Sequence, residues 1–236
     1  MSYLFDGSGA GSSLAGTMAS TYASDGVTLA CFVKVTAHPI AVDFLFGFGN
    51  IVNNDDNGYR IRTLGTDDTW QASRDSNAGV LANASVVTNI DNVWSGIVAT
   101  YTNSSLRNIY VGALANTAQN TTTGVVDNLL QFVRAGKSFD DSDGFTGRLA
   151  ELAIWNNVMS SANITSYMSG AIASGISPAN LIGYWPLSAS GATQANLGTD
   201  TGGTLTVTSA VFDSDHPIIT GGAVSPRGRM MMLGIG

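Results

Sequence analysis

The sequence predicts a single all-β sandwich domain, and three observations lead to this fold class. Short runs of alternating apolar and polar residues recur along the chain, which is the period-two pattern of half-buried strands. Asn, Asp, Gly and Ser residues separate these runs, as expected for tight turns. Charged residues make up only 11% of the chain and Glu151 is its only glutamate, so long exposed helices rich in Glu and Lys are not expected. A length of 236 residues is ordinary for one sandwich domain.

The clearest predicted strand covers residues 27–36. Apolar residues occupy every odd position in this range up to Val35, which places them on one face of the strand. Similar short runs follow at regular spacing, with turn residues between them, as is typical of sandwiches and barrels. The other predicted strands are 43–49, 58–64, 70–74, 93–101, 105–111, 129–135, 145–155, 181–187 and 204–208.

One amphipathic helix is predicted at residues 160–174. A serine at position 160 or 161 can cap its start, and Gly175 followed by Pro178 ends it. We expect its apolar stripe to pack against an edge or face of the sandwich. The stripe consists of Ile164, Tyr167, Met168, Ala171 and Ile172. Residues 7–24, rich in Gly, Ser and Ala, are predicted to form a loose loop before the strand at Val27.

Seven segments in chain order resemble the successive motifs of laminin-G-like, concanavalin A-like lectin domains. They are Tyr3–Gly7, Leu29–Val35, Asn92–Tyr101, Leu106–Gly112, Phe145–Trp155, Met159–Ile164 and Leu181–Leu187. One position departs from the family pattern, since Phe32 stands where the family has a tryptophan. The resemblance covers residues 1–212 and implies a jelly-roll sandwich of two antiparallel sheets. This fold hosts lectins, adhesion modules, glycosidases and structural proteins, so it leaves the function open.

The chain divides into a sandwich at residues 1–216 and an extended C-terminal arm at residues 217–236. Pro217, Pro226 and the pair Gly221-Gly222 disfavour a regular core strand in the arm. The arm ends in a short apolar run, which we expect to form an interface with another protein chain. The expected interface residues are Pro226, Met230, Met231, Met232 and Leu233.

Composition excludes several classes of partner. A net charge of −7 and a pI near 4.5 argue against nucleic acid, whose binding needs a basic face.

Cys31 is the only cysteine, so no intrachain disulfide forms, and we expect a buried, inert thiol. No run approaches the roughly 20 apolar residues of a membrane span. The first residues lack the basic start and apolar core of a signal peptide, so we expect neither membrane insertion nor secretion by that route.

The sequence predicts that the protein is not an enzyme. Most retaining glycosidases use two carboxylates close together, whereas Glu151 has no acidic neighbour within seven positions, so we predict a structural role for it. His38 and His216 each precede a proline, which favours extended or turn residues over catalytic ones. We expect Asp215 and His216 to form a hydrogen-bonded turn instead of a catalytic dyad.

Calcium is the one cofactor that the sequence leaves open. Related lectin domains often hold calcium with Asp and Asn oxygens in loops, and calcium takes six to eight oxygen ligands. Two loops offer such residues, Asn53–Asn57 and Asp140–Gly144. The alternative is that these side chains only form and cap turns. The candidate metal ligands are Asp140, Asp141 and Asp143; otherwise no cofactor is expected.

Carbohydrate binding would need an exposed aromatic platform beside polar groups. Trp94, Trp155 and Trp185 fall inside the strand motifs and are predicted to be core residues. Trp70 follows the polar segment 66–69 and is the tryptophan we expect to be exposed. A single tryptophan is weak support for a sugar site.

The preferred hypothesis is a non-enzymatic structural or adhesion component of a virus particle, such as a bacteriophage capsid decoration or tail-associated protein. Three observations motivate it. The module is lectin-like but has no visible secretion signal, its charge content is low with a mean hydropathy of +0.16, and its arm is apolar. Its expected partners are other virion proteins and further copies of itself, in a virion assembled in the host cytoplasm. The alternatives are a free module that binds surface glycans, with or without calcium, and a divergent glycoside hydrolase.

Overall fold

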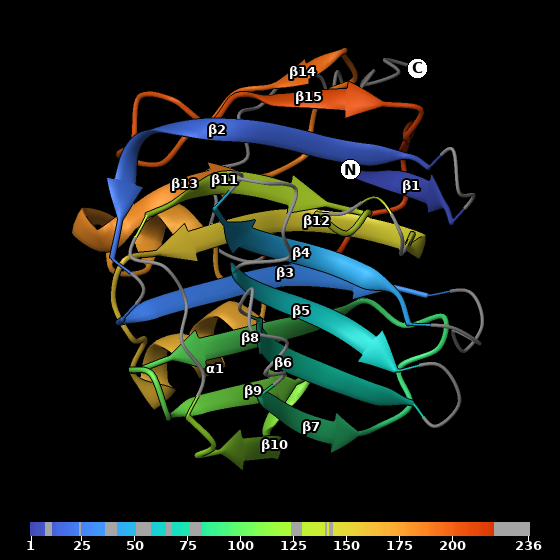
Figure 1. The fold of residues 1–236 in the computed structure, drawn as a ribbon. Coiled ribbons are helices and arrows are strands. Elements are labelled where there is room, and N and C mark those ends of the chain that lie inside the picture. Colours follow the sequence, from blue (N-terminus) through green and yellow to red (C-terminus); the bar gives the residue numbers. More distant parts are fainter. Residues whose placement is uncertain are drawn as a thin grey trace, which may run out of the picture.

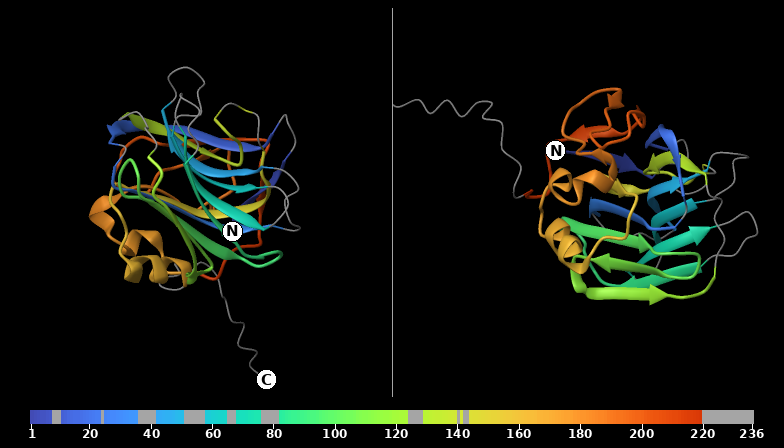
Figure 2. Two further views of the ribbon diagram at one scale, coloured as in Figure 1. Left: turned by 60° about the horizontal axis from the view of Figure 1, so that its bottom comes forward. Right: turned by 90° about the vertical axis from the view of Figure 1, so that its left-hand side faces the viewer.

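Two β-sheets stacked face to face form the body of the protein, which is described by a computed structural model (Figure 1). The structure describes residues 1–7, 11–23, 25–35, 42–50, 58–64, 68–75, 82–123, 129–139, 141 and 144–219. All strand pairings within the two sheets are antiparallel. Helix α1 (Ser161–Met168) lies outside the sandwich, against one of the sheets (Figure 2). The predicted all-β sandwich of two antiparallel sheets is therefore confirmed.

The longest strand of sheet A, β12, lies near the centre of that sheet. β12 is bordered by β3 on one side and by β1 and then β13 on the other. The spatial order is β10 (Ala113–Asn120), β9 (Arg107–Val111), β8 (Ser95–Tyr101), β3 (Val27–Lys34), β12 (Thr146–Trp155), β1 (Ser2–Asp6) and β16 (Val211–Asp213), with β13 (Leu181–Trp185) paired to β12.

Sheet B also has eight strands, and its edges are β14 and β7. The spatial order is β14 (Thr193–Gln194), β15 (Leu205–Thr208), β2 (Ser13–Tyr22), β11 (Leu130–Ala135), β4 (Phe44–Gly49), β5 (Gly58–Leu64), β6 (Thr69–Asp75) and β7 (Ala82–Val87). β4 to β7 pair in chain order, whereas β2 lies between β15 and β11, which are distant from it in sequence.

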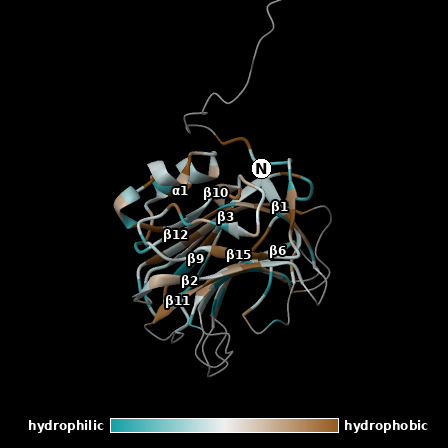
Figure 3. Ribbon diagram, turned by 90° about the horizontal axis from the view of Figure 1, so that it is seen from above, coloured by the Kyte–Doolittle hydropathy of each residue, from teal (hydrophilic) through white to brown (hydrophobic). Residues whose placement is uncertain are grey.

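One apolar cluster fills the space between the sheets. In Figure 3 the brown, hydrophobic segments lie mainly along the strands of the two layers. The indole rings of Trp70 and Trp185 are buried in this cluster, and each indole N–H donates to a backbone carbonyl, of Thr88 at 2.9 Å and of Gly203 at 2.7 Å. Burying these large rings with their polar atoms satisfied stabilises the sandwich.

A second apolar cluster covers the outer face of sheet A. Tyr167 of α1 packs on Phe32 of β3 with ring centroids 5.3 Å apart, and edge-on against Trp155 of β12 at 5.9 Å. Ile164 from the same helix face is also buried there. The helix therefore packs on a face of the sandwich, as its apolar stripe predicts.

Helix α1 is shorter than the sequence predicts. Ser160 caps its start, and its hydroxyl accepts a hydrogen bond from the Asn163 N–H at 3.3 Å. The helix ends at Met168, where Gly170 has a φ of +90°. The N–H groups of Gly170 and Ala171 donate to the carbonyls of Tyr167 and Ser166, which is the hydrogen-bond pattern of a Schellman motif. The predicted end at Gly175 is wrong because Gly170 adopts the left-handed conformation first.

All the predicted strands from 27–36 to 204–208 are present, and their ends differ from the prediction by no more than two residues. The predicted loop at residues 7–24 is wrong, since β2 occupies most of it. Leu14 and Met18 are buried along β2, and Gly16 lets the backbone of Thr204 approach, because a Cβ at Gly16 would lie 2.4 Å from the Thr204 carbonyl oxygen. The sequence analysis also missed the edge strands β7, β10, β14 and β16.

We expect Gly136→Ala to destabilise the fold far more than Gly26→Ala. Both glycines have positive φ values, +80° and +75°, so alanine strains the backbone at each by about 1 kcal/mol. A Cβ at Gly136 would also lie 2.1 Å from the Phe5 ring, whereas nothing lies within 4 Å of one at Gly26. The resulting overpacking adds about 1–3 kcal/mol. Urea unfolding of both variants measures the difference, and equal losses would contradict this account of Gly136.

Candidate functional site

A set of charged side chains holds the chain after β16 on the outer face of sheet A. The Asp215 carboxylate accepts hydrogen bonds from Lys34 Nζ at 2.8 Å and from Trp94 Nε1 at 2.9 Å. Arg148 Nη2 lies 3.0 Å from the Asp213 carboxylate. Lys34 on β3 and Arg148 on β12 are directly paired in register, so they present two adjacent cations to the two aspartates. We call these five residues the clamp.

The electrostatics of the clamp favour ionised aspartates. The hydrogen bond from Lys34, followed by the one from Trp94, holds the pKa of Asp215 below its ordinary value. The Asp215 backbone N–H, and then Arg148, lowers the pKa of Asp213. Both carboxylates stay charged at neutral pH, so the clamp is an ion-pair network instead of a single exposed pair. The sequence analysis missed the clamp, although a lone lysine on an otherwise apolar strand was a signal for it.

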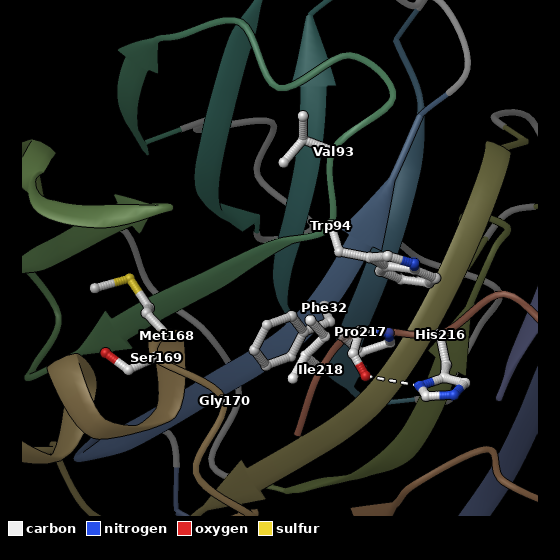
Figure 4. Close-up of a pocket in the computed structure, with 9 residues that line it drawn as sticks. All are labelled: Phe32, Val93, Trp94, Met168, Ser169, Gly170, His216, Pro217 and Ile218. Atoms are coloured by element: carbon white, nitrogen blue, oxygen red, sulfur yellow. Dashed lines mark hydrogen bonds between the residues drawn. The ribbon is translucent and has the colours of Figure 1, made fainter. Parts of the chain in front are cut away.

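Two shallow pockets lie beside the clamp, around the end of helix α1. The larger, of about 310 Å³, is closed on one side by the chain that follows the clamp (Figure 4). Its lining residues are Phe32, Val93, Trp94, Met168, Ser169, Gly170, His216, Pro217 and Ile218. The smaller, of about 230 Å³, shares Met168 and Ser169 with it and extends towards Leu114 at the start of β10. We call the two pockets together the α1 groove.

The α1 groove is an apolar surface open to solvent. Val93 and Ile218 on its walls are 59% and 84% exposed. Trp94, which contributes its indole to both the clamp and the groove, is only partly buried. The predictions for two tryptophans are therefore wrong: Trp94 is a surface residue of the groove, and Trp70, expected to be exposed, is 1% exposed in the core. Trp70 faces inward because it lies on the same face of β6 as Ala72, whose register partner is the core residue Ile61, and because its own partner on β7, Val86, packs against the core.

Asp215 and His216 do not form a catalytic dyad in the structure. The Asp215 carboxylate is engaged by Lys34 and Trp94, while His216 Nδ1 lies 2.8 Å from the carbonyl oxygen of Pro217. His216 thus lies in an irregular segment after the bend at Ser214, and the hydrogen-bonded turn expected at Asp215 and His216 is not assigned there.

Glu151 sits at an irregularity in β12. Its φ is +53°, and the pairing of β12 with β3 shifts register across this position. The Tyr184 hydroxyl donates to the Glu151 carboxylate at 2.6 Å, and the Tyr167 hydroxyl donates to the Glu151 carbonyl. Burial raises the pKa of Glu151, although Tyr184 opposes the shift. These contacts give Glu151 a structural anchoring role in the part of the chain that the structure describes.

The calcium candidate Asp141 is engaged by two cations. Its carboxylate accepts a hydrogen bond from Arg134 Nη2, and Lys137 Nζ lies 3.2 Å away. Burial acts to raise the pKa of Asp141, but the bonds from Lys137 and Arg134 outweigh it and hold the pKa below its ordinary value. A calcium ion would have to displace or share these partners. No group of three or more metal-ligating side chains occurs among the described residues.

Several predicted residues lie outside the described part of the chain. They are the calcium candidates Asp140 and Asp143, the segment Asn53–Asn57, His38, and the interface residues Pro226, Met230, Met231, Met232 and Leu233. The division between a sandwich at 1–216 and an arm at 217–236 stays a prediction. Among the described residues, no helix has the length and apolarity needed to cross a membrane.

The outer face of sheet B carries a polar row that the sequence analysis did not single out. Arg62, Gln71 and Ser85 lie side by side on β5, β6 and β7. Arg62 Nε donates to Gln71 Oε1 at 3.0 Å, and Gln71 Nε2 donates to Ser85 Oγ at 2.8 Å. In the next row the Ser73 hydroxyl is buried without a hydrogen-bond partner among the described residues. Arg62 and Gln71 are only 8% and 3% exposed, so the exposed Ser85 is the member of the row that a polar ligand can reach directly.

We expect Glu151→Gln to raise the melting temperature at pH 7, with the gain shrinking as the pH falls towards 4. The pKa of Glu151 is raised in the folded protein, so its protonated carboxyl favours the folded state. This contribution to the free energy of unfolding is complete below the ordinary carboxyl pKa and is lost as the pH rises through the raised pKa. A neutral glutamine removes the cost of burying the charge while it can still accept the Tyr184 bond.

Asp141→Asn is the control of opposite sign. The pKa of Asp141 is lowered, so its contribution is present above the ordinary pKa and is lost as the pH falls through the lowered one. The variant should melt slightly lower than the parent at pH 7 and equally at the acid end. Thermal melts by circular dichroism between pH 4 and pH 8 test both, and a Glu151→Gln variant less stable than the parent at every pH would refute the burial argument.

Comparison with known sequences and structures places the fold in a family. The sequence profile of the Concanavalin A-like lectin/glucanases superfamily, of the laminin G type, matches residues 6–165. No curated protein matches the sequence. A candidate carbohydrate-binding protein from Bacteroides ovatus superposes with a TM-score of 0.59 at 15% identity, over 88% of this chain and 59% of that one.

Two further solved structures share the architecture. A heptameric SAP-like pentraxin from Limulus polyphemus superposes with a TM-score of 0.55 at 13% identity, over 71% of this chain and 81% of that one. The enzymatically active domain of tailspike protein 2 from bacteriophage CBA120 gives a TM-score of 0.51 at 13% identity, over 71% of this chain and 27% of that one. The chain thus spans less than two thirds of the Bacteroides and tailspike proteins, and at these identities the likeness shows the fold alone.

The profile match confirms the resemblance read from the seven strand and helix motifs. It covers most of the sandwich, including β3, β8, β9 and β12, and the strands pair in the two antiparallel sheets that the family implies. The chain belongs to the concanavalin A-like lectin/glucanase superfamily and folds as a laminin-G-like sandwich.

Proposed function

We propose that this chain is a non-enzymatic structural or adhesion component of a virus particle, of bacteriophage type, which attaches to its neighbours through its C-terminal arm. The observation that carries the proposal is the clamp. Lys34, Trp94 and Arg148 hold Asp213 and Asp215 on the outer face of sheet A, just before the arm begins. A fixed origin gives an arm a defined direction, which a docking segment needs and an unattached tail does not.

The arm has the length and charge to reach another chain. Residues 220–236 number seventeen and extend up to about 56 Å at roughly 3.3 Å per residue, longer than the ~34 Å of a ten-residue strand such as β2. The arm contains Arg227 and Arg229 and no acidic residue, so its charge is +2. The rest of the chain carries −9, which gives the total of −7. A basic arm is attracted to the acidic surface of a further copy.

The α1 groove offers that arm an apolar docking place on a neighbouring copy. Exposed Val93 and the side chains of Phe32 and Met168 line it. Unbranched methionines adapt to irregular apolar pockets, which suits the run Met230–Leu233. Each copy carries both an arm and a groove, so a contact of this kind can repeat from copy to copy.

Two of the similar solved structures support the proposal at the level of the fold. One is a domain of a bacteriophage tailspike and the other is a pentraxin described as heptameric. The same sandwich thus serves in a virus particle and in a repeated assembly. The likeness of folds supports the proposal without extending to the partners or activity of either protein.

We expect the full chain to form a defined oligomer and a chain ending at Ile219 to be a monomer. The truncated chain keeps the clamp and the buried Pro217 but loses residues 220–236 of the arm. Light scattering after size exclusion measures the mass of each. Val93→Asp, which puts a charge into the groove, should also give monomers. The matched control is Leu197→Asp, because Leu197 has the same 59% exposure as Val93 but lies outside the groove.

Mass spectrometry of purified particles tests the virion role directly. The chain should be present in intact particles at a fixed ratio to the major structural protein, and immunogold labelling should mark their surface. A protein absent from particles would overturn the proposal. A monomeric full chain that is nevertheless present in particles would show that its arm docks onto a different virion protein.

A free carbohydrate-binding module is the second candidate, and the polar row on sheet B favours it. Arg62, Gln71 and Ser85 form a chain of hydrogen bonds that ends at the exposed Ser85, where a sugar hydroxyl can extend it. The Bacteroides ovatus protein with a similar fold is itself a candidate carbohydrate-binding protein. The divergent glycoside hydrolase gains no support from the geometry, because Glu151 is bonded to Tyr184 and pairs with no second carboxylate among the described residues.

A glycan array, screened with and without calcium, tests the second candidate. If the polar row binds sugar, Gln71→Ala should weaken binding by about tenfold, which corresponds to the loss of roughly one or two hydrogen bonds. Gln119→Ala on edge strand β10 is the control and should bind as the parent does. Binding that requires calcium and is lost in Asp141→Asn would support a metal site at the Asp140–Asp143 loop. No binding to any glycan would leave the assembly role as the remaining candidate.

A further inference from the structure

Two arginines lie buried between the sheets at one end of the sandwich. Arg74 of β6 and Arg107 of β9 are 2% and 1% exposed. Their neighbours in register, Tyr59 and Tyr101, both belong to the core cluster, so the arginines face inward from opposite sheets. The two tyrosine rings stack with centroids 4.0 Å apart, and the guanidinium carbon of Arg74 lies 5.3 Å from the centre of the Tyr59 ring. The two cations thus share one aromatic wall.

Much of the hydrogen-bonding capacity of these two guanidiniums is unused. Arg74 Nη1 donates to the Asn103 carbonyl at 2.9 Å, and Arg107 Nη2 donates to the carbonyls of Ser105 and Thr122. Arg74 Nε and two nitrogens of Arg107, Nε and Nη1, are buried without a hydrogen-bond partner in the part of the chain that the structure describes. A buried charged donor that bonds to nothing bears its whole desolvation penalty.

The positive charge of the pair is also poorly compensated. Among the described residues, Asp25 is the one carboxylate in an ion pair with either arginine, at 3.9 Å from Arg74 Nη1, and its side chain is 60% exposed. An ion pair at that distance and exposure is weak and screened by solvent. Burial lowers the pKa of Arg107, and the charge of Arg74 acts in the same direction. Arginine nevertheless stays protonated in proteins, so two cations remain close together.

We infer that this end of the sandwich binds a small oxyanion between Arg74 and Arg107. Carboxylate, sulfate and phosphate groups each present several oxygens in a geometry that guanidinium N–H groups match. Such an ion would accept bonds from the three unused donors and neutralise the excess charge. This inference is independent of the proposed function, because the site lies between the sheets and the clamp lies on the outer face of sheet A.

Two residues that bond to the arginines are exposed to solvent. Asn103 and Thr122, whose carbonyls accept bonds from Arg74 and Arg107, are both exposed at the rim. The Asn103 side chain accepts bonds from the Ser105 and Leu106 N–H groups at 2.9 Å each, which fixes the loop over the arginines. Each guanidinium is therefore hydrogen-bonded directly to a residue at the surface of the molecule.

Nuclear magnetic resonance of the arginine Nε–H groups in the full chain tests the inference. Sodium sulfate, inorganic phosphate and glucuronate are each titrated against sodium chloride at constant ionic strength. We expect the Nε–H signals of Arg74 and Arg107 to shift saturably at millimolar anion, while the signal of Arg148 in the clamp does not. Saturation by glucuronate as well as by sulfate would identify an acidic sugar as a ligand class, and saturation by sulfate or phosphate alone would identify an inorganic anion.

Two variants separate binding from a merely structural role. Arg107→Lys keeps the charge but loses the planar fork, and it should weaken anion binding by about tenfold or more. Asp25→Asn changes only an exposed side chain, and it should tighten binding several-fold because it removes the carboxylate that competes for Arg74. Arg148→Lys is the control and should bind as the parent does. Signals that do not saturate in the full chain, with no response in Asp25→Asn, would overturn the inference and assign the three donors to enclosed water.

Discussion

Strand β12 pairs with β3 along one edge and with β1 and β13 along the other, and this pairing buries a ten-residue strand on both of its faces. Leu149 and Ile154 face the opposite sheet, while Ala153 and Trp155 lie under helix α1. Every backbone group of such a strand needs a partner, because water cannot reach it. The irregularity at Glu151 meets this requirement through the Tyr167 hydroxyl, which donates to its carbonyl. The position of the helix and the burial of the only glutamate therefore follow from one constraint.

The same constraint gives the sandwich two different outer faces. The outer face of sheet A is apolar where α1 covers it, and where the helix ends the face continues as the open α1 groove beside the clamp. The outer face of sheet B carries arginine, glutamine and serine side chains in hydrogen-bonded rows. A sandwich with one apolar and one polar outer face has a built-in orientation. The open α1 groove lies on the first of these faces, and the polar side chains of the second are largely buried, with Arg62 8% and Gln71 3% exposed.

The centre of the fold could be predicted from the sequence, and its margins could not. Strands such as β3 and β12 alternate or are continuously apolar because they are buried, so their residues reveal them. β2 resembles a loop in sequence because it is rich in small residues, and at one of them, Gly16, the close approach of the Thr204 backbone leaves no room for a side chain. β7 and β10 lie at or near sheet edges, where polar residues are tolerated.

The candidate site depends on long-range contacts that a sequence pattern does not encode. Lys34 and Asp215 are 181 residues apart in the chain, and the successive pairing of β3 with β12, β12 with β1 and β1 with β16 brings them together. Trp70 and Trp94 also differ from their expected places: the register of β6 directs Trp70 into the core, and Trp94 lies just before β8 begins at Ser95. The resemblance to lectin domains identified the superfamily, but it could not indicate the clamp, whose residues lie partly in the chain beyond the matched segment.

Because Trp94 is partly exposed, the intrinsic tryptophan fluorescence of the protein can report on the clamp. Trp70, Trp155 and Trp185 are each at most 1% exposed, so a collisional quencher in solution cannot reach them. The quenchable, red-shifted part of the intrinsic emission then belongs to Trp94, whose indole N–H is bonded to Asp215. A spectrometer can therefore follow what happens at this one position in the unlabelled molecule, whether inside a particle or free in solution.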